Sequence, residues 1–317
     1  MGKPARIAGG KPWPAMLESQ ADEDTTRGRT ADRAFTGVAA TEPRKAIWFK
    51  RRVGVIRALR ELWAFRALIV ALAERDLRIR YKQAALGVAW GILTPIAMML
   101  AFTLVFTKFG HVATNGVPYP LFSYVGLIPW TFFSGAILAG GMSLSANISL
   151  LNKLYCPREV FPLGTIVVAA ADGLVSTLVL LVLFPIEHST PTRESFYVPV
   201  MLLILVAFTA GVTLAVSAVV VYMRDLRIAL PLVIQLGLFL TPVAYGASAI
   251  AKSRTSLIVF SALNPLVPVI DGLRRTMLLG QSPDWTLELV GAGTASVVLA
   301  GGFLLFKRLE TGLADVA

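Results

Sequence analysis

Cysteine and histidine are scarce in this sequence, and the common nucleotide-binding loop is absent. Among 317 residues there are one cysteine, Cys156, and two histidines. A single cysteine excludes a disulfide within the chain, and two histidines leave little for a metal site. The Gly-x-x-x-x-Gly-Lys-Ser/Thr loop does not occur, which excludes ATP hydrolysis by that route. No paired carboxylates, Ser/His/Asp set or Cys/His cluster supports an enzyme. We therefore expect neither a metal nor a catalytic site.

Charge is also scarce over six long stretches, and this predicts a membrane protein. Charged residues make up 15% of the chain and hydrophobic residues 56%, with a mean hydropathy of +0.68. A helix of about 20 apolar residues crosses a hydrocarbon core of about 30 Å, and the polar stripe of a soluble helix is missing here. We predict an all-α polytopic membrane protein. Its six transmembrane helices cover residues 86–109, 120–143, 160–186, 197–223, 228–250 and 286–306.

Positive charge is concentrated before the first of these stretches. The net charge is +11, and residues 44–82 hold 12 of the 30 lysines and arginines. Such a block usually lies on the cytoplasmic side near anionic headgroups, so we expect membrane lipid and no nucleic acid as a partner. Six crossings then place both termini in the cytoplasm. Residues 1–50, which have no apolar core, are predicted to be a disordered cytoplasmic tail, and residues 51–317 the membrane domain.

The stretch before the last span is apolar but too short to cross a bilayer. Asn264 and Pro265 interrupt it, and proline breaks a helix because it lacks an N–H donor. We expect residues 252–283 to form a re-entrant external hairpin that dips into the outer leaflet. Arg274 and Arg275, which follow the break, are expected at headgroup level.

Two of the predicted spans share a local pattern. The letters RDLRI occur at 75–79 and again at 224–228, and each copy precedes a span that contains a Thr-Pro pair. These pairs are Thr94-Pro95 and Thr241-Pro242. Proline in mid-helix frees a carbonyl and bends the helix, so we predict that the first and fifth spans are kinked partners.

Residues 60–82 combine apolar and basic positions at helical spacing. Leu62, Phe65, Ile69, Leu72 and Ile79 fall near one face, which predicts an amphipathic helix in the cytoplasmic interface. A simple basic membrane anchor is the alternative. The residues available to lipid headgroups are Arg75, Asp76, Arg78, Arg80, Tyr81 and Lys82.

A compact turn joins the second and third spans. Residues 149–159 contain a short apolar piece, a proline and a charged pair, a shape suited to docking into another protein. An ordinary tight loop is the alternative. The residues that would make the contact are Leu151, Asn152, Lys153, Tyr155, Pro157, Arg158 and Glu159.

Asp172 is the ionisable residue deep inside a predicted span. An intramembrane carboxylate is costly and is a functional candidate, but a proton relay usually needs several such groups. A structural acid at a helix–helix or subunit contact is therefore favoured. Aromatic residues in the first two spans form either an interface belt or the lining of a path. The candidates for channel lining are Phe102, Phe106, Trp130, Phe132 and Phe133.

Several strings together carry a family resemblance. They are RDLRIRYKQAALGVAW at 75–90 with the later Thr94-Pro95, CPREVFPL at 156–163 and FKRLE at 306–310. From about residue 62 to its end, the chain resembles the membrane (permease) subunit of type 2 bacterial ABC exporters. Within that group it is most similar to exporters of lipid-linked polysaccharide such as O-antigen, teichoic acid or cell-wall galactan.

The resemblance implies an assembly and a set of roles. Two copies of the chain would pair in the bacterial plasma membrane with two separate ATPase subunits, which would bind ATP and Mg. Residues 149–159 would be the coupling helix, 60–82 the interface helix that guides the lipid headgroup, and 252–283 the external gate. The substrate implied is a polyprenyl-pyrophosphate-linked polysaccharide. The alternatives are a drug or small-lipid exporter of the same superfamily and a membrane enzyme acting on lipid-linked sugars.

Overall fold

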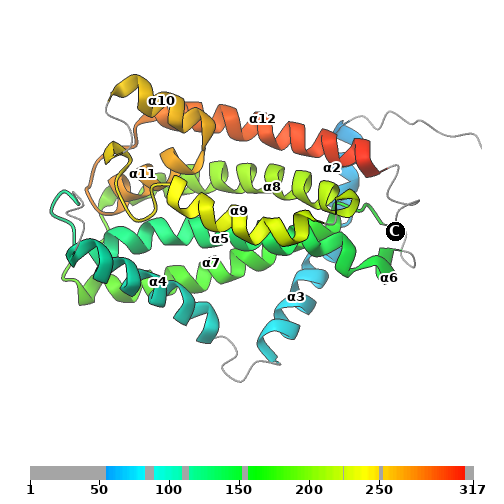
Figure 1. Ribbon diagram of the computed structural model, residues 1–317, viewed down its shortest axis with the longest axis horizontal. Coiled ribbons are helices and arrows are strands. Elements are labelled where there is room, and N and C mark those ends of the chain that lie inside the picture. The colour runs from blue at the N-terminus through cyan, green and yellow to red at the C-terminus, as the bar shows by residue number, and fades with distance from the viewer. Residues whose placement is uncertain are drawn as a thin grey trace, which may run out of the picture. The chain divides into compact units, whose positions relative to one another are not determined.

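The computed structural model describes residues 55–82, 89–108, 114–151, 156–223, 225–249 and 253–310. All regular structure in these residues is helical, which confirms the predicted all-α fold (Figure 1). The predicted tail at 1–50 lies outside the described residues. The described helices are α2 (Val55–Ala64), α3 (Arg66–Lys82), α4 (Ala89–Lys108), α5 (Tyr119–Ala146), α6 (Ile148–Leu151), α7 (Val160–Ile186), η1 (Arg193–Tyr197), α8 (Val198–Tyr222), α9 (Leu226–Leu240), η2 (Ala247–Ala249), α10 (Arg254–Leu263), α11 (Leu266–Met277) and α12 (Trp285–Glu310).

Five helices are long and apolar enough to cross a membrane: α4, α5, α7, α8 with the preceding η1, and α12. The fifth predicted span, 228–250, is wrong in its length, because α9 has 15 residues and ends at Leu240. The next residue, Thr241, has the extended backbone (φ −98°, ψ 137°) that proline imposes on its predecessor. Pro242 therefore follows a helix end rather than a kink, whereas Pro95 lies inside α4.

The predicted break before the last span is present. Helices α10 and α11 are bent by 116° relative to each other, and Asn264 between them is extended. Asn264 Nδ2 donates to Thr241 Oγ1 at 2.9 Å, and its Oδ1 accepts from the Leu266 backbone N–H at 3.1 Å. The Asn-Pro pair therefore ends one helix and starts the next. A re-entrant hairpin in a membrane remains our prediction for this geometry.

The core lies around α5, which packs against α7, α8, α4 and α11, and α12 covers the other side of α8. In Figure 1 α5, α7, α8 and α12 run roughly side by side, while α3 and α4 slope away from them. Helices α8 and α12 approach closely, because a Cβ atom at Gly211 would lie 2.6 Å from the Leu299 backbone. Small residues allow such contacts between apolar helices, where lipid supplies no hydrophobic drive for association.

The predicted interface helix at 60–82 is two helices, α2 and α3, separated by a turn at Phe65. Helix α3 packs against α7 and buries Leu72. Ile79 is 53% exposed, and a helix whose apolar face lies in the membrane interface remains our prediction. Arg80 and Tyr81 near the end of α3 contact Asp172 of α7.

Candidate functional site

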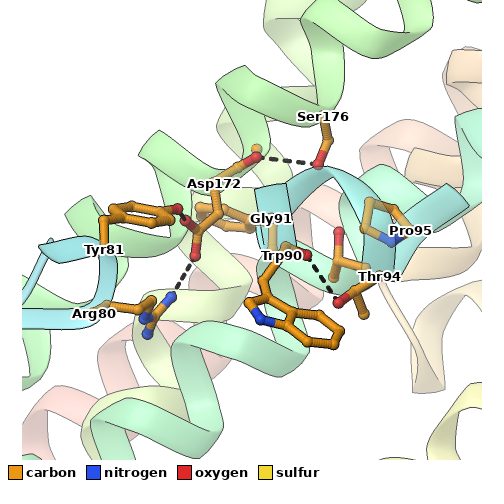
Figure 2. Close-up of a pocket in the computed structure, with 11 residues that line it drawn as sticks. Arg80, Tyr81, Trp90, Gly91, Thr94, Pro95, Asp172 and Ser176 are labelled. Carbon is orange, nitrogen blue, oxygen red and sulfur yellow. Dashed lines mark hydrogen bonds and ion pairs between the residues drawn. The ribbon is translucent and has the colours of Figure 1, made fainter. Parts of the chain in front are cut away.

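A cavity of about 410 Å³ lies where the end of α3 meets the start of α4 over α5 and α7 (Figure 2). This volume is in the range of small-ligand sites. The cavity combines a cation, an anion and several apolar or aromatic side chains. It is lined by Arg80 and Tyr81 of α3, Trp90, Gly91, Thr94 and Pro95 of α4, Thr131 and Phe132 of α5, and Asp172, Gly173 and Ser176 of α7.

Asp172 accepts hydrogen bonds from two residues of α3 at the wall of this cavity. Arg80 Nη1 lies 2.6 Å from Asp172 Oδ2, and the Tyr81 hydroxyl donates to Oδ1. Burial raises the pKa of Tyr81 to about 12, and the hydrogen bond to Asp172 acts in the same direction, so Tyr81 is a neutral donor. Figure 2 shows both side chains pointing toward Asp172 from the α3 end. Asp172 therefore lies at a contact between α7 and α3.

Arg75, Asp76 and Arg78 of the predicted interface helix also have protein partners. Arg75 Nη2 donates to Asn147 Oδ1 at 2.8 Å and also pairs with Asp76, which ties α3 to the end of α5. Arg78 pairs with Glu74 one turn earlier. The Lys82 side chain lies outside the described residues. Among the described basic residues of α3's second half, Arg80 is therefore the one whose partner lies at the cavity.

The turn at 149–159 packs against the end of α12. Leu151 ends α6, and Asn152, Lys153 and Tyr155 lie outside the described residues. Arg158 Nη1 donates to the Glu310 carbonyl at 3.1 Å, and Glu159 pairs with Lys307. Burial raises the pKa of Glu159, and the charge of Glu310 adds to the effect.

This packing corrects the prediction that the Glu159 side chain faces another protein. Glu159 is fully buried, and Lys307 stands between it and Glu310, with Lys307 Nζ 2.9 Å from Glu310 Oε2. Pro157, which precedes Arg158 and Glu159 in the chain, is half-buried. A partner docking here would contact the rest of the turn, and the buried pair would hold that turn to α12.

The predicted channel-lining aromatics separate into the buried residues of α5 and the half-buried residues of α4. Phe132, Trp130 and Phe133 are all buried, but only Phe132 of these three also lines the cavity, and Phe133 stacks on Phe208 at 5.3 Å between ring centroids. Phe102 and Phe106 of α4 are half-buried and meet edge to face at 6.1 Å. Within this chain, two of the five candidates are therefore packing residues rather than residues along an open path.

Arg274 is buried inside the protein and not exposed at headgroup level as expected. It is 4% exposed, and its guanidinium donates to four backbone carbonyls (Figure 1 shows α11 beside the α9 end). Its Cζ lies 3.8 Å from the centre of the Phe122 ring. Arg275 is partly exposed, lies 4.0 Å from Asp271 and donates to the Ser282 carbonyl. Pro265 directly precedes α11 as its N-cap residue.

The sequence matches the ABC-2 type transporter family over residues 67–278, more than half of the chain. The chain belongs to this family. The matched residues include α3, the cavity, the 149–159 turn and both helices of the bent pair. Family membership and the apolar helices together make the chain a multi-pass membrane protein.

Named relatives of this ABC-2 family member are similar over most of their length. The O-antigen export system permease protein RfbA of Myxococcus xanthus is 34% identical over 263 residues, which is 82% of this chain and 99% of that protein. The protein of the same name from Klebsiella pneumoniae is 25% identical over 250 residues, 78% of this chain and 94% of that protein. The polysialic acid transport protein KpsM of Escherichia coli is 24% identical over 253 residues, with 77% and 94% covered.

Two residues of this ABC-2 chain were missed by sequence reasoning. Lys307, noted in the sequence only as part of the string FKRLE, pairs with the buried Glu159, and the matched family segment ends before α12. Glu288 in the first turn of α12 is 3% exposed and points at Gly272, although it was given no role within the predicted span 286–306. A carboxylate followed directly by an apolar run was the signal available for Glu288, and no signal in a single sequence pairs Lys307 with Glu159.

Proposed function

We propose that this chain is the permease subunit of an ATP-driven exporter of lipid-linked polysaccharide of the O-antigen type. The observation that carries the proposal is 34% identity with an O-antigen export permease over nearly all of that protein. The further relatives named for O-antigen export and polysialic acid transport also handle polysaccharides. Polysaccharide as the substrate class is therefore favoured over a drug or a small lipid.

The cavity supports a substrate that is both anionic and lipidic. Arg80 offers a guanidinium, which binds phosphate well because its donors form a planar fork. Trp90 and Phe132 offer aromatic surface in the same cavity, and the adjoining α4 exposes apolar side chains such as Leu93. A polyprenyl diphosphate carrying a sugar has matching parts: a charged headgroup, an apolar chain and sugar rings.

Energy would come from a partner. The sequence has no phosphate-binding loop, so we propose two separate ATPase subunits on a dimer of this chain. The end of the bundle that carries Arg158 and Lys307 would face the bacterial cytoplasm with both termini, and the 149–159 turn would contact the ATPase. The bent α10–α11 pair would then lie on the outer side as the gate.

Reconstitution tests this proposal. The chain would be co-purified with the ATPase encoded beside it and placed in nanodiscs, and ATP hydrolysis measured with lipid-linked O-antigen-type glycan or with small amphiphilic drugs. We expect the lipid-linked glycan to stimulate hydrolysis and the drugs to have no effect. Deleting the chain should also leave the lipid-linked polymer inside the cell. Stimulation by drugs alone, or chemical conversion of the glycan by the purified chain without an ATPase, would overturn the proposal.

A further inference from the structure

Asp172 lies in the middle of an apolar helix, where a carboxylate needs compensation. It is twelve residues from the start of α7, or about 18 Å along the helix axis. An uncompensated charge at that depth is expensive. Arg80 and Tyr81 supply the compensation from α3, so the charge ties the end of α3 to the middle of α7.

The Arg80–Asp172 pair is open to the cavity. The side chains are 49% and 30% exposed, and both belong to the cavity lining. Arg274, in contrast, is buried and fixed by four carbonyl acceptors. Because both side chains are part-exposed, the Asp172 carboxylate can be solvated through the cavity once it is displaced, so an incoming anion can compete for the Arg80 guanidinium.

The donors that hold Asp172 suit a phosphate oxygen equally well. A guanidinium and a phenol hydroxyl converge on one carboxylate, with Arg80 Nη1 2.6 Å from Oδ2. Charge-assisted hydrogen bonds of this kind are made with carboxylate and phosphate alike. The Tyr81 hydroxyl also lies beside α4, because a Cβ atom at Gly91 would sit 3.4 Å from it. Helices α3, α4 and α7 therefore meet at this anion position.

We propose that Asp172 is an internal counter-anion that occupies Arg80 and Tyr81 until a phosphate of the lipid-linked substrate displaces it. This inference rests on the proposed function. Asp172 then lowers the affinity for the headgroup and rejects neutral lipids, which cannot compete for Arg80. Because the displaced carboxylate repels the bound phosphate, it also favours release of the headgroup from the entry cavity.

Binding of a polyprenyl diphosphate tests the competition directly. The permease–ATPase complex in nanodiscs, without ATP, would be titrated with this probe and with the neutral polyprenol. Asp172→Asn keeps the shape and removes the charge, and we expect it to bind the diphosphate about three- to tenfold more tightly, because Arg80 is no longer occupied. Arg80→Gln should weaken binding, and Asp172→Asn should raise affinity by a smaller factor in the Arg80→Gln background than in the natural chain, because only Tyr81 and the charge repulsion are then relieved. Glu187→Gln, directly after the last residue of α7, is the matched control and should bind like the natural chain.

The outcomes separate the two proposals. If Asp172→Asn assembles and melts like the natural complex but binds the diphosphate no more tightly, the counter-anion role is overturned. If Asp172→Asn raises affinity by the same factor in the Arg80→Gln background as in the natural chain, Asp172 does not act through Arg80 and the inference fails as well. Asp172→Ser gives the same test should the asparagine variant not assemble. If the natural complex binds no polyprenyl diphosphate at all, the proposed function itself fails, irrespective of Asp172.

Discussion

Helices α4 and α5 are both uncharged over their apolar parts, yet they have opposite surroundings. In α5, 72% of the most apolar stretch is buried, against 11% in α4. Leu127 of α5 is fully buried, whereas Leu104 of α4 is 59% exposed. Apolarity therefore identifies membrane helices but not what covers them. Helix α9 resembles α4, because its Phe239 is 64% exposed. The exposed faces of α4 and α9 are available to lipid or to a second copy of the chain.

Arg274 links the buried helix α5 to the end of the exposed helix α9. From α11 it donates to the Phe122 carbonyl of α5 and to carbonyls in the turn after α9, including those of Pro242 and Tyr245. We expect Arg274→Met to lower the free energy of unfolding by on the order of 4 kcal/mol, since each buried carbonyl left unsatisfied costs about 1–3 kcal/mol. Reversible unfolding in mixed micelles would measure the loss, and hydrogen exchange should rise selectively at 241–249.

The neighbouring Arg275 provides the control. Its side chain is one-third exposed and has weaker contacts, so Arg275→Met should change stability by less than about 1 kcal/mol. Equal effects of the two variants would mean that the carbonyl contacts of Arg274 do not fix the end of α9.

The general fold was predictable because a membrane span needs only length and missing charge. The end of α9 was not, because Thr241-Pro242 resembles Thr94-Pro95 in sequence. Only the tertiary contacts differ: the carbonyl of Pro242 is held by Arg274, while Pro95 continues α4. A local motif cannot report which of two prolines ends its helix when the deciding partner lies elsewhere in the chain.

The candidate site was predicted as separate residues rather than as an arrangement. Asp172 stood out by its depth, and Arg80 belonged to a basic segment, but 92 residues separate them and nothing local indicates the contact. Glu159 was assigned to the surface because it lies in a charged turn. Its partner, Lys307, belongs to the last helix, so its burial depends on how α7 and α12 pack.

Truncating matched leucines sharpens the comparison of the two helices. Leu127→Ala in α5 should cost about 3 kcal/mol, because it removes a fully buried side chain and leaves a cavity. Leu104→Ala in α4 should stay within about 0.5 kcal/mol at low protein concentration in detergent, because it removes exposed surface. A loss at Leu104 that grows with protein concentration would show that a second copy covers α4. Similar, concentration-independent losses would contradict the difference in burial.

The smallest of the expected effects concerns the contact between α8 and α12, where adjacent glycines give an internal comparison. A Cβ atom at Gly302 would collide with the Gly211 backbone, while one at Gly301 meets nothing within 4 Å. We expect Gly302→Val to cost about 1–3 kcal/mol, because neither backbone can retreat without separating the helices. Gly301→Val should be nearly neutral, since both variants make the same small change in helix propensity and only the side chain at 302 meets a neighbour. Thermal unfolding in nanodiscs would compare them. Equal destabilisation would mean that valine in the helix, and not the close approach of α12 to α8, causes the loss. Helix α12 would then belong with the peripheral helices α4 and α9 instead of with the core.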